Sequence, residues 1–282
     1  MAFDINPVTN HREREKGVII YPVYSRRSAG LSIGINLFPD KKTCQFDCPY
    51  CEVFPFSGSA EFSLEQMEED LRFVITSAKE QNILIKDICF SGNGEPTLSP
   101  FFGSAFKLAE KIRVSEAASA KLVVITNGAG LLQPQTFTLL GDTCAADAAP
   151  DNSYIDIWLK LDAGTPEWYK KINRCALQYE KLIEKIKEFT SCAAVTIQTM
   201  LCAINGEAPY ETETKAWEAL VCELAAKKCA NIRKVQMYGK ARSAPEDPLA
   251  SSLPDEYLEK RAASLRKMFA EKGITTQVEI YI

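Results

Sequence analysis

Short runs of apolar and β-branched residues alternate along the chain with longer segments whose apolar positions recur at helical spacing. This alternation is the sequence form of repeated βα units around a parallel sheet. We expect strands at 32–38, 87–91, 122–126, 155–161, 194–201 and 233–238. Six such strands predict a partial barrel, and 282 residues suit one α/β barrel domain.

Helical patterns separate these strands. Ser63-Leu64-Glu65-Gln66 has the form of a capping box and begins an amphipathic helix whose apolar positions are Leu64, Met67, Leu71, Val74 and Ala78. Thr165-Pro166-Glu167 predicts a second helix start, with proline in the first turn. Further helical segments are expected at 102–113, 180–189, 214–227 and 255–271.

The predicted barrel spans residues 31–245, between an N-terminal extension at 1–30 and a C-terminal helix and strand at 246–282. Residues 141–153 are rich in Ala, Asp and Pro and predict a surface loop before the fourth strand. The run 276–282 is expected either to pair at the open edge of the barrel or to cover its bottom.

Composition and charge change this picture little. A 46% hydrophobic and 25% charged chain is typical of a globular protein, and a net charge of −4 gives no overall basic field for nucleic acid. Basic residues do gather locally, either as a contact surface or as solvated helix ends and loops; they are Lys227, Lys228, Arg233, Lys234, Lys240 and Arg242. Ten scattered cysteines, without a secretory signal or a membrane-length apolar run, favour a reduced, cytoplasmic protein without a disulfide framework.

Three cysteines carry the strongest chemical signal. Cys44, Cys48 and Cys51 have the spacing C-x3-C-x2-C on one short segment. Three thiolates leave one iron of a cubane [4Fe–4S] cluster without a protein ligand, which makes that iron a place for chemistry. A structural zinc site is the weaker alternative, because it needs a fourth Cys or His and the only histidine, His11, stands apart. The other cysteines show no second ligand pattern.

Polar residues follow several predicted strands. Gly92-Asn93-Gly94-Glu95 lacks the spacing of a phosphate loop, and its carboxylate suits an ammonium group, although a plain turn has the same composition. Lys160 and Asp162 point to the same face, either as ligand contacts or as a structural ion pair. Thr126, Asn127, Gln198 and Thr199 are hydrogen-bonding residues at or near other strand ends.

These motifs together resemble those of the radical S-adenosylmethionine (SAM) enzymes. The family signature is C-x3-C-x-aromatic-C, with Tyr50 in the aromatic position, and Asn93-Gly94-Glu95-Pro96-Thr97 is similar to the family's Gly-Gly-Glu motif. Thr126-Asn127-Gly128 and the run from Lys160 to Gly164 fall where the family has SAM-contacting strand ends. The resemblance covers residues 20 to 245 and is greatest to the small iron–sulfur branch related to the wyosine tRNA-base synthases.

The resemblance implies a partial (β/α)6 barrel, one [4Fe–4S] cluster on the three cysteines, and SAM as cofactor. It implies contacts of Glu95 with the methionine amine, of Lys160 with the carboxylate, of Asp162 with the ribose and of Tyr50 with adenine. Other residues expected to bind the cofactor are Gly92, Asn93, Gly94, Thr126, Asn127 and Gln198. In the superfamily, reductive cleavage of SAM usually gives a 5′-deoxyadenosyl radical that abstracts hydrogen from the substrate.

Several substrates remain open at this point. Kinship to the wyosine synthases favours an RNA base such as one in tRNA, although no second cluster motif is visible. A glycyl-radical-enzyme activase, or a radical enzyme acting on a peptide or small metabolite, is the alternative. A non-enzymatic electron carrier or cluster sensor leaves Glu95 and Lys160 unexplained. The reductant is expected to be a protein such as flavodoxin or ferredoxin, with no membrane partner.

Overall fold

The structure is a computed structural model that describes residues 17–143, 154–226, 232–242, 244 and 247–282. Eight strands make up the main sheet, and contacts along the chain divide it into two compact units. The first unit comprises residues 1–44, 53–125 and 149–156, and the second comprises 45–52, 126–148 and 157–282.

The first unit holds four strands in the hydrogen-bonded order β1-β2-β3-β4. They are β1 (Ile20–Ser25), β2 (Gly30–Ile35), β3 (Ile85–Phe90) and β4 (Lys121–Thr126). β1 runs antiparallel to β2, and the following pairs are parallel. The sheet therefore begins within the segment that the sequence assigns to an N-terminal extension.

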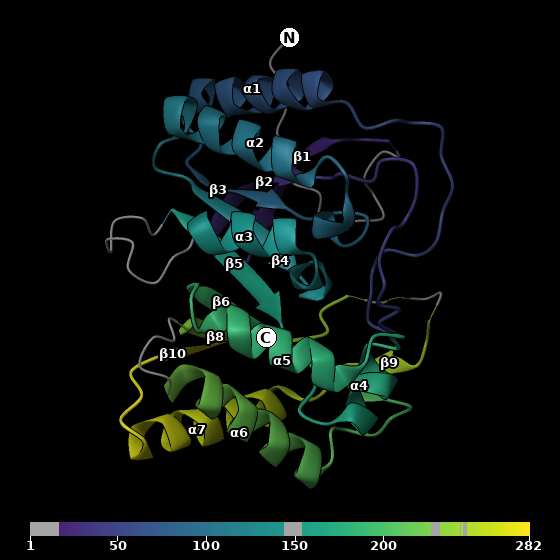
Figure 1. The fold of residues 1–282 in the computed structure, drawn as a ribbon, viewed down its shortest axis with the longest axis vertical. Coiled ribbons are helices and arrows are strands. Elements are labelled where there is room, and N and C mark those ends of the chain that lie inside the picture. Colours follow the sequence, from purple (N-terminus) through teal and green to yellow (C-terminus); the bar gives the residue numbers. More distant parts are fainter. Residues whose placement is uncertain (1–16, 144–153, 227–231, 243, 245–246) are drawn as a thin grey trace. The chain divides into compact units, whose positions relative to one another are not determined.

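Two helices of this unit, α1 (Leu64–Glu80) and α2 (Phe102–Glu116), lie side by side over the strands (Figure 1). The Ser63 side chain accepts a hydrogen bond from the Gln66 amide at 3.2 Å, which confirms the predicted N-cap of α1. Met67, Leu71 and Ile75 are fully buried along one face of the helix. A short 3-10 turn, η2 (Pro96–Leu98), follows β3.

In the second unit, which contains β5 from residue 157 onward, the strand order is β5-β6-β8-β10, all in parallel pairs. These strands are β5 (Ile155–Lys160), β6 (Val195–Leu201), β8 (Ile232–Gly239) and β10 (Gln277–Tyr281). The last of them confirms that the C-terminal run pairs at a sheet edge, beside β8. A separate two-stranded sheet joins β7 (Ala203–Ile204) to β9 (Ala250–Ser251).

The helices of the second unit are α3 (Pro134–Thr143), α4 (Pro166–Ile172), α5 (Tyr179–Thr190), α6 (Glu211–Ala226) and α7 (Asp255–Glu271), and η3 (Ala129–Leu132) is a 3-10 turn. α6 and α7 lie next to each other, and α7 also contacts β8 and β10 (Figure 1). Thr165 caps α4 through the Trp168 amide at 3.2 Å, as predicted from its Thr-Pro-Glu start. Within the described residues no helix has the length and apolar character needed to cross a membrane.

Strand residues of the second unit divide into two faces. Ile157 and Leu159 of β5, Ile197 of β6 and Val235 of β8 are fully buried apolar residues. The alternate positions are polar at the level of Lys160, which is in register with Gln198, itself in register with Gln236. The candidate site lies at the carboxyl end of β5, where Lys160 is the last residue of the strand.

Candidate functional site: the cysteine loop and the β5 end

The segment 45–52, which carries Cys48 and Cys51, packs within the second unit. The Cys51 amide donates to the Cys48 carbonyl at 3.0 Å, so the two cysteines flank a tight turn. Phe46 packs edge-on against Tyr169 of α4, with ring centroids 5.7 Å apart. The Asp47 amide donates to the Asn173 carbonyl at 2.9 Å. The cysteine loop is therefore held against α4 and the residue that follows it.

The three motif cysteines form no disulfide with any described residue, and each is half-buried. Burial, followed by the negative charge of Asp162, raises the pKa of the Cys48 thiol to about 12. Asn173 and Tyr50 act in the opposite direction by hydrogen bonding to the sulfur. A thiol of this kind becomes a thiolate when a cation binds it, because the cation's charge outweighs the desolvation.

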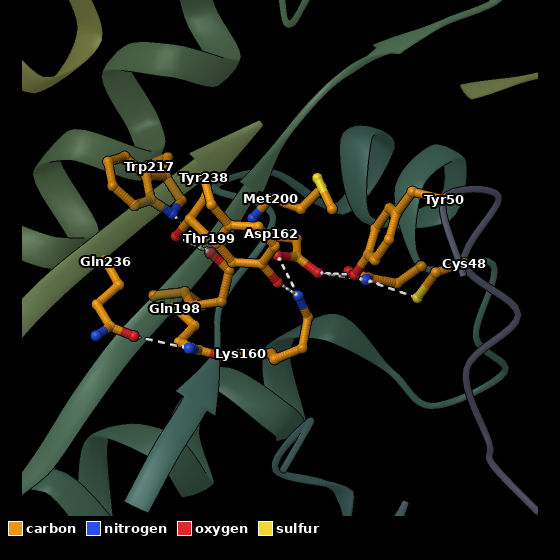
Figure 2. Close-up of polar contacts among 12 residues, drawn as sticks. Cys48, Tyr50, Lys160, Asp162, Gln198, Thr199, Met200, Trp217, Gln236 and Tyr238 are labelled. Atoms are coloured by element: carbon orange, nitrogen blue, oxygen red, sulfur yellow. Dashed lines mark hydrogen bonds and ion pairs between the residues drawn. The ribbon is translucent and has the colours of Figure 1, made fainter. Parts of the chain in front are cut away.

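Asp162 is the centre of the polar cluster beside this loop (Figure 2). Its side chain is 1% exposed. Its Oδ1 atom accepts from the Met200 amide at 2.9 Å and lies 3.2 Å from the Lys160 ammonium. Its Oδ2 atom accepts hydrogen bonds from the Tyr50 hydroxyl and, at 3.2 Å, from the Asn173 amide. Four donors hold the carboxylate in one position.

The Lys160 ammonium lies among oxygen atoms and aromatic rings. It donates to the Tyr238 hydroxyl and sits 4.9 Å from the ring centre of Tyr50 and 5.0 Å from that of Tyr238. Burial alone would lower the pKa of Lys160, but Asp162 and Tyr238 outweigh it, so the pKa lies above its ordinary value. The ion pair between Lys160 and Asp162, one of the two alternatives predicted from the sequence, is therefore formed.

The other predicted residues of the second unit lie in different surroundings. Gln198 is fully buried and donates to the Gln236 side chain at 2.7 Å, as Figure 2 shows. Thr126 accepts from the Gly128 amide at 3.1 Å, and Asn127 accepts from the Ala129 amide at 2.9 Å. These last two side chains stabilise the turn after β4. Their roles in binding a cofactor stay predictions.

In the first unit, the segment Gly92 to Glu95 is joined to the residue before Cys44. The Thr43 amide donates to the Asn93 carbonyl at 3.0 Å, and the Glu95 amide donates to the Thr43 carbonyl at 2.8 Å. The Glu95 carboxylate is buried and accepts from the Thr97 hydroxyl at 2.6 Å. The segment that sequence assigned to ammonium binding therefore also fixes the backbone at the start of the cysteine motif.

Gly94→Ala is expected to destabilise the protein by about 3 kcal/mol, because strained backbone and a steric clash combine there. Gly94 has φ of 150°, and a Cβ atom on it would lie 1.9 Å from the Thr43 carbonyl oxygen. Gly206→Ala is the matched control, since Gly206 also has positive φ, of 77°, but nothing lies within 4 Å of its Cβ position. Urea unfolding of both variants measures the difference; equal losses would contradict the role of the Thr43 contact.

Sequence reasoning missed three residues of the second unit. Asn173 contacts Cys48 and Asp162, Tyr238 contacts Lys160, and Glu213 accepts from the Gly164 amide at 2.6 Å and the Thr165 hydroxyl at 2.5 Å. Only Tyr238 had a local signal, as a polar aromatic residue near the end of a predicted strand. The other two lie on or after helices, and tertiary packing alone brings them to the β5 end.

Two arginines bind the borders of the cysteine loop. Arg174 donates to the Asp47 carbonyl at 2.6 Å and forms an ion pair with Asp247. Arg242 donates to Glu52 at 2.7 Å. Arg242, one of the basic residues that gather locally in the sequence, is thus engaged by a carboxylate of the chain itself.

Among the described residues no group of three or more His, Cys, Asp or Glu side chains gathers around one point. A cubane does not require such a point, because each cysteine binds a different iron. Cys44, Cys48 and Cys51, each half-buried, are the residues that would hold such a cluster.

Comparison with known sequences finds relatives of one kind, and no protein-family model matches the chain. A UPF0026 protein of Helicobacter pylori (strain J99 / ATCC 700824) is 32% identical over 124 residues, which are 42% of this chain and 37% of that protein. The UPF0026 protein slr1464 of Synechocystis sp. is 28% identical over 192 residues, which are 64% of this chain and 63% of that protein. The match therefore spans less than two thirds of each relative.

Solved structures share the fold at low sequence identity. SuiB of Streptococcus suis, bound to S-adenosylmethionine, has a TM-score of 0.61 at 14% identity, covering 86% of this chain and 49% of that one. A radical SAM methyltransferase of Sphaerobacter thermophilus has a TM-score of 0.60 at 12% identity, covering 92% and 68%. TYW1 with a lysine–pyruvate adduct has a TM-score of 0.53 at 18% identity, covering 84% and 73%. The predicted resemblance is confirmed at the level of architecture: the chain has the partial-barrel fold of the radical SAM superfamily.

Proposed function

We propose that the chain is a radical SAM enzyme that holds one [4Fe–4S] cluster through Cys44, Cys48 and Cys51. The observation that carries the proposal is the packing of Cys48 and Tyr50 beside the Lys160–Asp162 pair at the carboxyl end of β5. In parallel α/β barrels the carboxyl ends of the strands carry the active site. Cysteine motif, strand-end charges and fold thus support the same chemistry.

Each polar group in this cluster has a role toward SAM. Lys160 supplies a positive charge for the methionine carboxylate, and Asp162 supplies acceptor oxygens for the ribose hydroxyls. Tyr50, within the cysteine turn, donates to Asp162, lies beside the Lys160 ammonium and offers an aromatic face to adenine. In the first unit, the buried Glu95 carboxylate is the acceptor for the methionine amine. Gly92, Asn93, Gly94, Thr126, Asn127 and Gln198 are the further proposed contacts.

The cluster, when bound, supplies the electron that cleaves a carbon–sulfur bond of SAM. The chain's own residues orient SAM and exclude water. Four donors hold the Asp162 carboxylate in one position, so the carboxylate needs little ordering when a ribose hydroxyl of SAM takes the place of one of them. The electron comes from a donor protein of the flavodoxin or ferredoxin class, in a reducing cytoplasmic compartment.

For the substrate we propose an RNA base, with a peptide as the second candidate. The basic stretch after α6 favours RNA, but two of its described cations already have acidic partners: Lys234 lies 3.0 Å from Glu279, and Arg242 pairs with Glu52. Lys227 and Lys228 lie outside the described residues. A peptide is favoured by the fold shared with SuiB, which is known bound to the precursor peptide SuiA. Activation of a glycyl-radical enzyme and modification of a small metabolite are the remaining alternatives.

Bulk tRNA is expected to stimulate SAM cleavage and to bind with a steep dependence on salt. If Arg233, Lys234, Lys240 and Arg242 each contact a phosphate, affinity should fall about a hundredfold between about 50 and about 200 mM salt, because each contact releases counterions. Filter binding at both salt concentrations and measurement of 5′-deoxyadenosine with and without tRNA test this. Absence of binding at low salt, with cleavage indifferent to tRNA, would exclude tRNA and favour the peptide.

A further inference from the structure

Asn173 touches both parts of the candidate site in the second unit. It follows α4 directly and is 1% exposed. Its Nδ2 atom donates to the Cys48 sulfur at 3.5 Å and to Asp162 Oδ2 at 3.2 Å. Its backbone carbonyl accepts from the Asp47 amide. One buried residue therefore contacts a cysteine of the cluster motif, the loop backbone and the central carboxylate.

The chemistry of its partners fixes the orientation of this amide. A side-chain amide carries two N–H donors on nitrogen and only acceptor lone pairs on oxygen. Rotation by half a turn would place the oxygen against a carboxylate oxygen and a sulfur, both electron-rich. The two N–H groups of Asn173 match its two acceptors, the Cys48 sulfur and Asp162 Oδ2. Replacing this buried amide removes both hydrogen bonds and leaves the acceptors without these donors.

We propose that Asn173 is a positioning residue that raises the reduction potential of the cluster bound at Cys48 and couples that potential to the occupancy of Asp162. This inference rests on the proposed function. Reduction adds one electron, delivered by the external donor protein, and increases the negative charge on the ligating sulfurs. An N–H group donating to such a sulfur stabilises the reduced cluster more than the oxidised one.

The side-chain amide of Asn173 couples the reduction potential to SAM binding because it donates to both Cys48 and Asp162. Asp162 now accepts from Tyr50, Lys160 and Met200 as well as from Asn173. A ligand hydroxyl or ammonium that binds Asp162 competes for the same oxygen atoms. The amide then shifts toward the Cys48 sulfur, so SAM binding raises the potential further through Asn173.

The test is a redox titration of the reconstituted protein with and without SAM. The electron paramagnetic resonance signal of the reduced cluster measures the fraction reduced at each potential. Asn173→Leu removes both donors but keeps the number and branching of side-chain heavy atoms, and we expect reduction to become about tenfold less favourable, which is 59 mV for one electron. The SAM-induced change in potential should shrink as well. Asn173→Ser keeps one hydroxyl donor and should recover part of the potential. Arg174→Gln is the matched control: it removes the contacts with Asp47 and Asp247 but leaves the amide of Asn173, so its potential should equal that of the wild type.

Equal potentials in wild type and Asn173→Leu, at equal iron content, would overturn the inference. If Asn173→Leu cannot hold the cluster, the potentials of Asn173→Ser and Arg174→Gln are compared instead. A lowered potential in both variants would show that the segment acts through loop packing alone, and this result would also overturn the inference. Failure of the wild-type chain to bind iron and sulfide would instead reject the proposed function, and with it the role of Asn173.

Discussion

Cys48→Ala is expected to lower bound iron from about four atoms per chain to below one, and SAM cleavage to background. Removal of one of only three protein ligands leaves two irons without a protein ligand, and the cluster dissociates. Cys44→Ala and Cys51→Ala should behave in the same way. Iron and sulfide analysis after anaerobic reconstitution, with 5′-deoxyadenosine measured by chromatography, gives both quantities.

Cys192→Ala is the control for this series. Cys192 is exposed at the end of α5, where its thiol lies 3.3 Å from the Phe189 carbonyl, and it is not part of the motif. This variant should keep full iron content and activity. Four irons retained in a variant lacking all three motif cysteines would show that other cysteines bind the cluster and would contradict the assignment.

Local sequence predicts most strands of the sheet to within two residues at their starts and three at their ends. The clearest cases are β4, β5 and β6, each of which matches its predicted range to within one residue at either end. β1 is different because Pro22 interrupts its pattern. Proline cannot donate to a sheet, but β1 is an edge strand with β2 as its neighbour, so the missing donor costs little there.

Local signals also set the limits of the helix predictions. The Ser63 cap forms, but the reciprocal half of the predicted capping box is replaced: the Gln66 side chain donates to Asp70 at 2.8 Å instead. α3 and the two-residue strands β7 and β9 gave no periodic signal of their own. The predicted loop at 141–153 lies mostly outside the described residues, and α3 ends within its first three positions, at Thr143.

For the candidate site, sequence analysis identifies residues whose type and spacing form a recognisable pattern. It misses residues that reach the site only through tertiary packing. Lys160 and Asp162 are two apart on a strand, so their shared face follows from the backbone alone. Asn173 belongs to the site because it contacts Cys48, which lies 125 positions away in the chain, and no local sequence pattern indicates this contact. The choice between a ligand-binding and a structural Lys160–Asp162 pair also needs more than geometry, since the ion pair is compatible with both.

A double-mutant cycle on Lys160 and Asp162 is expected to separate these roles. Lys160→Met or Asp162→Asn alone should destabilise the folded protein by about 3 kcal/mol, because each leaves a buried group without its charged partner. The double variant should recover most of that loss, since neither charge then remains buried. Urea unfolding of the four proteins measures this coupling. Lys185→Met on α5, where Lys185 lies 2.5 Å from Glu188 in a partly exposed pair, should change stability by no more than about 0.5 kcal/mol.

SAM affinity should not follow stability in this cycle. If Lys160 binds the SAM carboxylate and Asp162 the ribose, the double variant recovers its stability but binds SAM at least about thirtyfold more weakly than the wild type, which corresponds to about 2 kcal/mol for a lost charged hydrogen bond. A purely structural pair gives the reverse: a stable double variant with unchanged SAM affinity. Calorimetric titration of SAM into the reconstituted wild-type and double-variant proteins distinguishes the two results. Four donors hold Asp162 in one position, and this pre-organisation is lost in the double variant even where its fold is restored, so we expect the weakened binding.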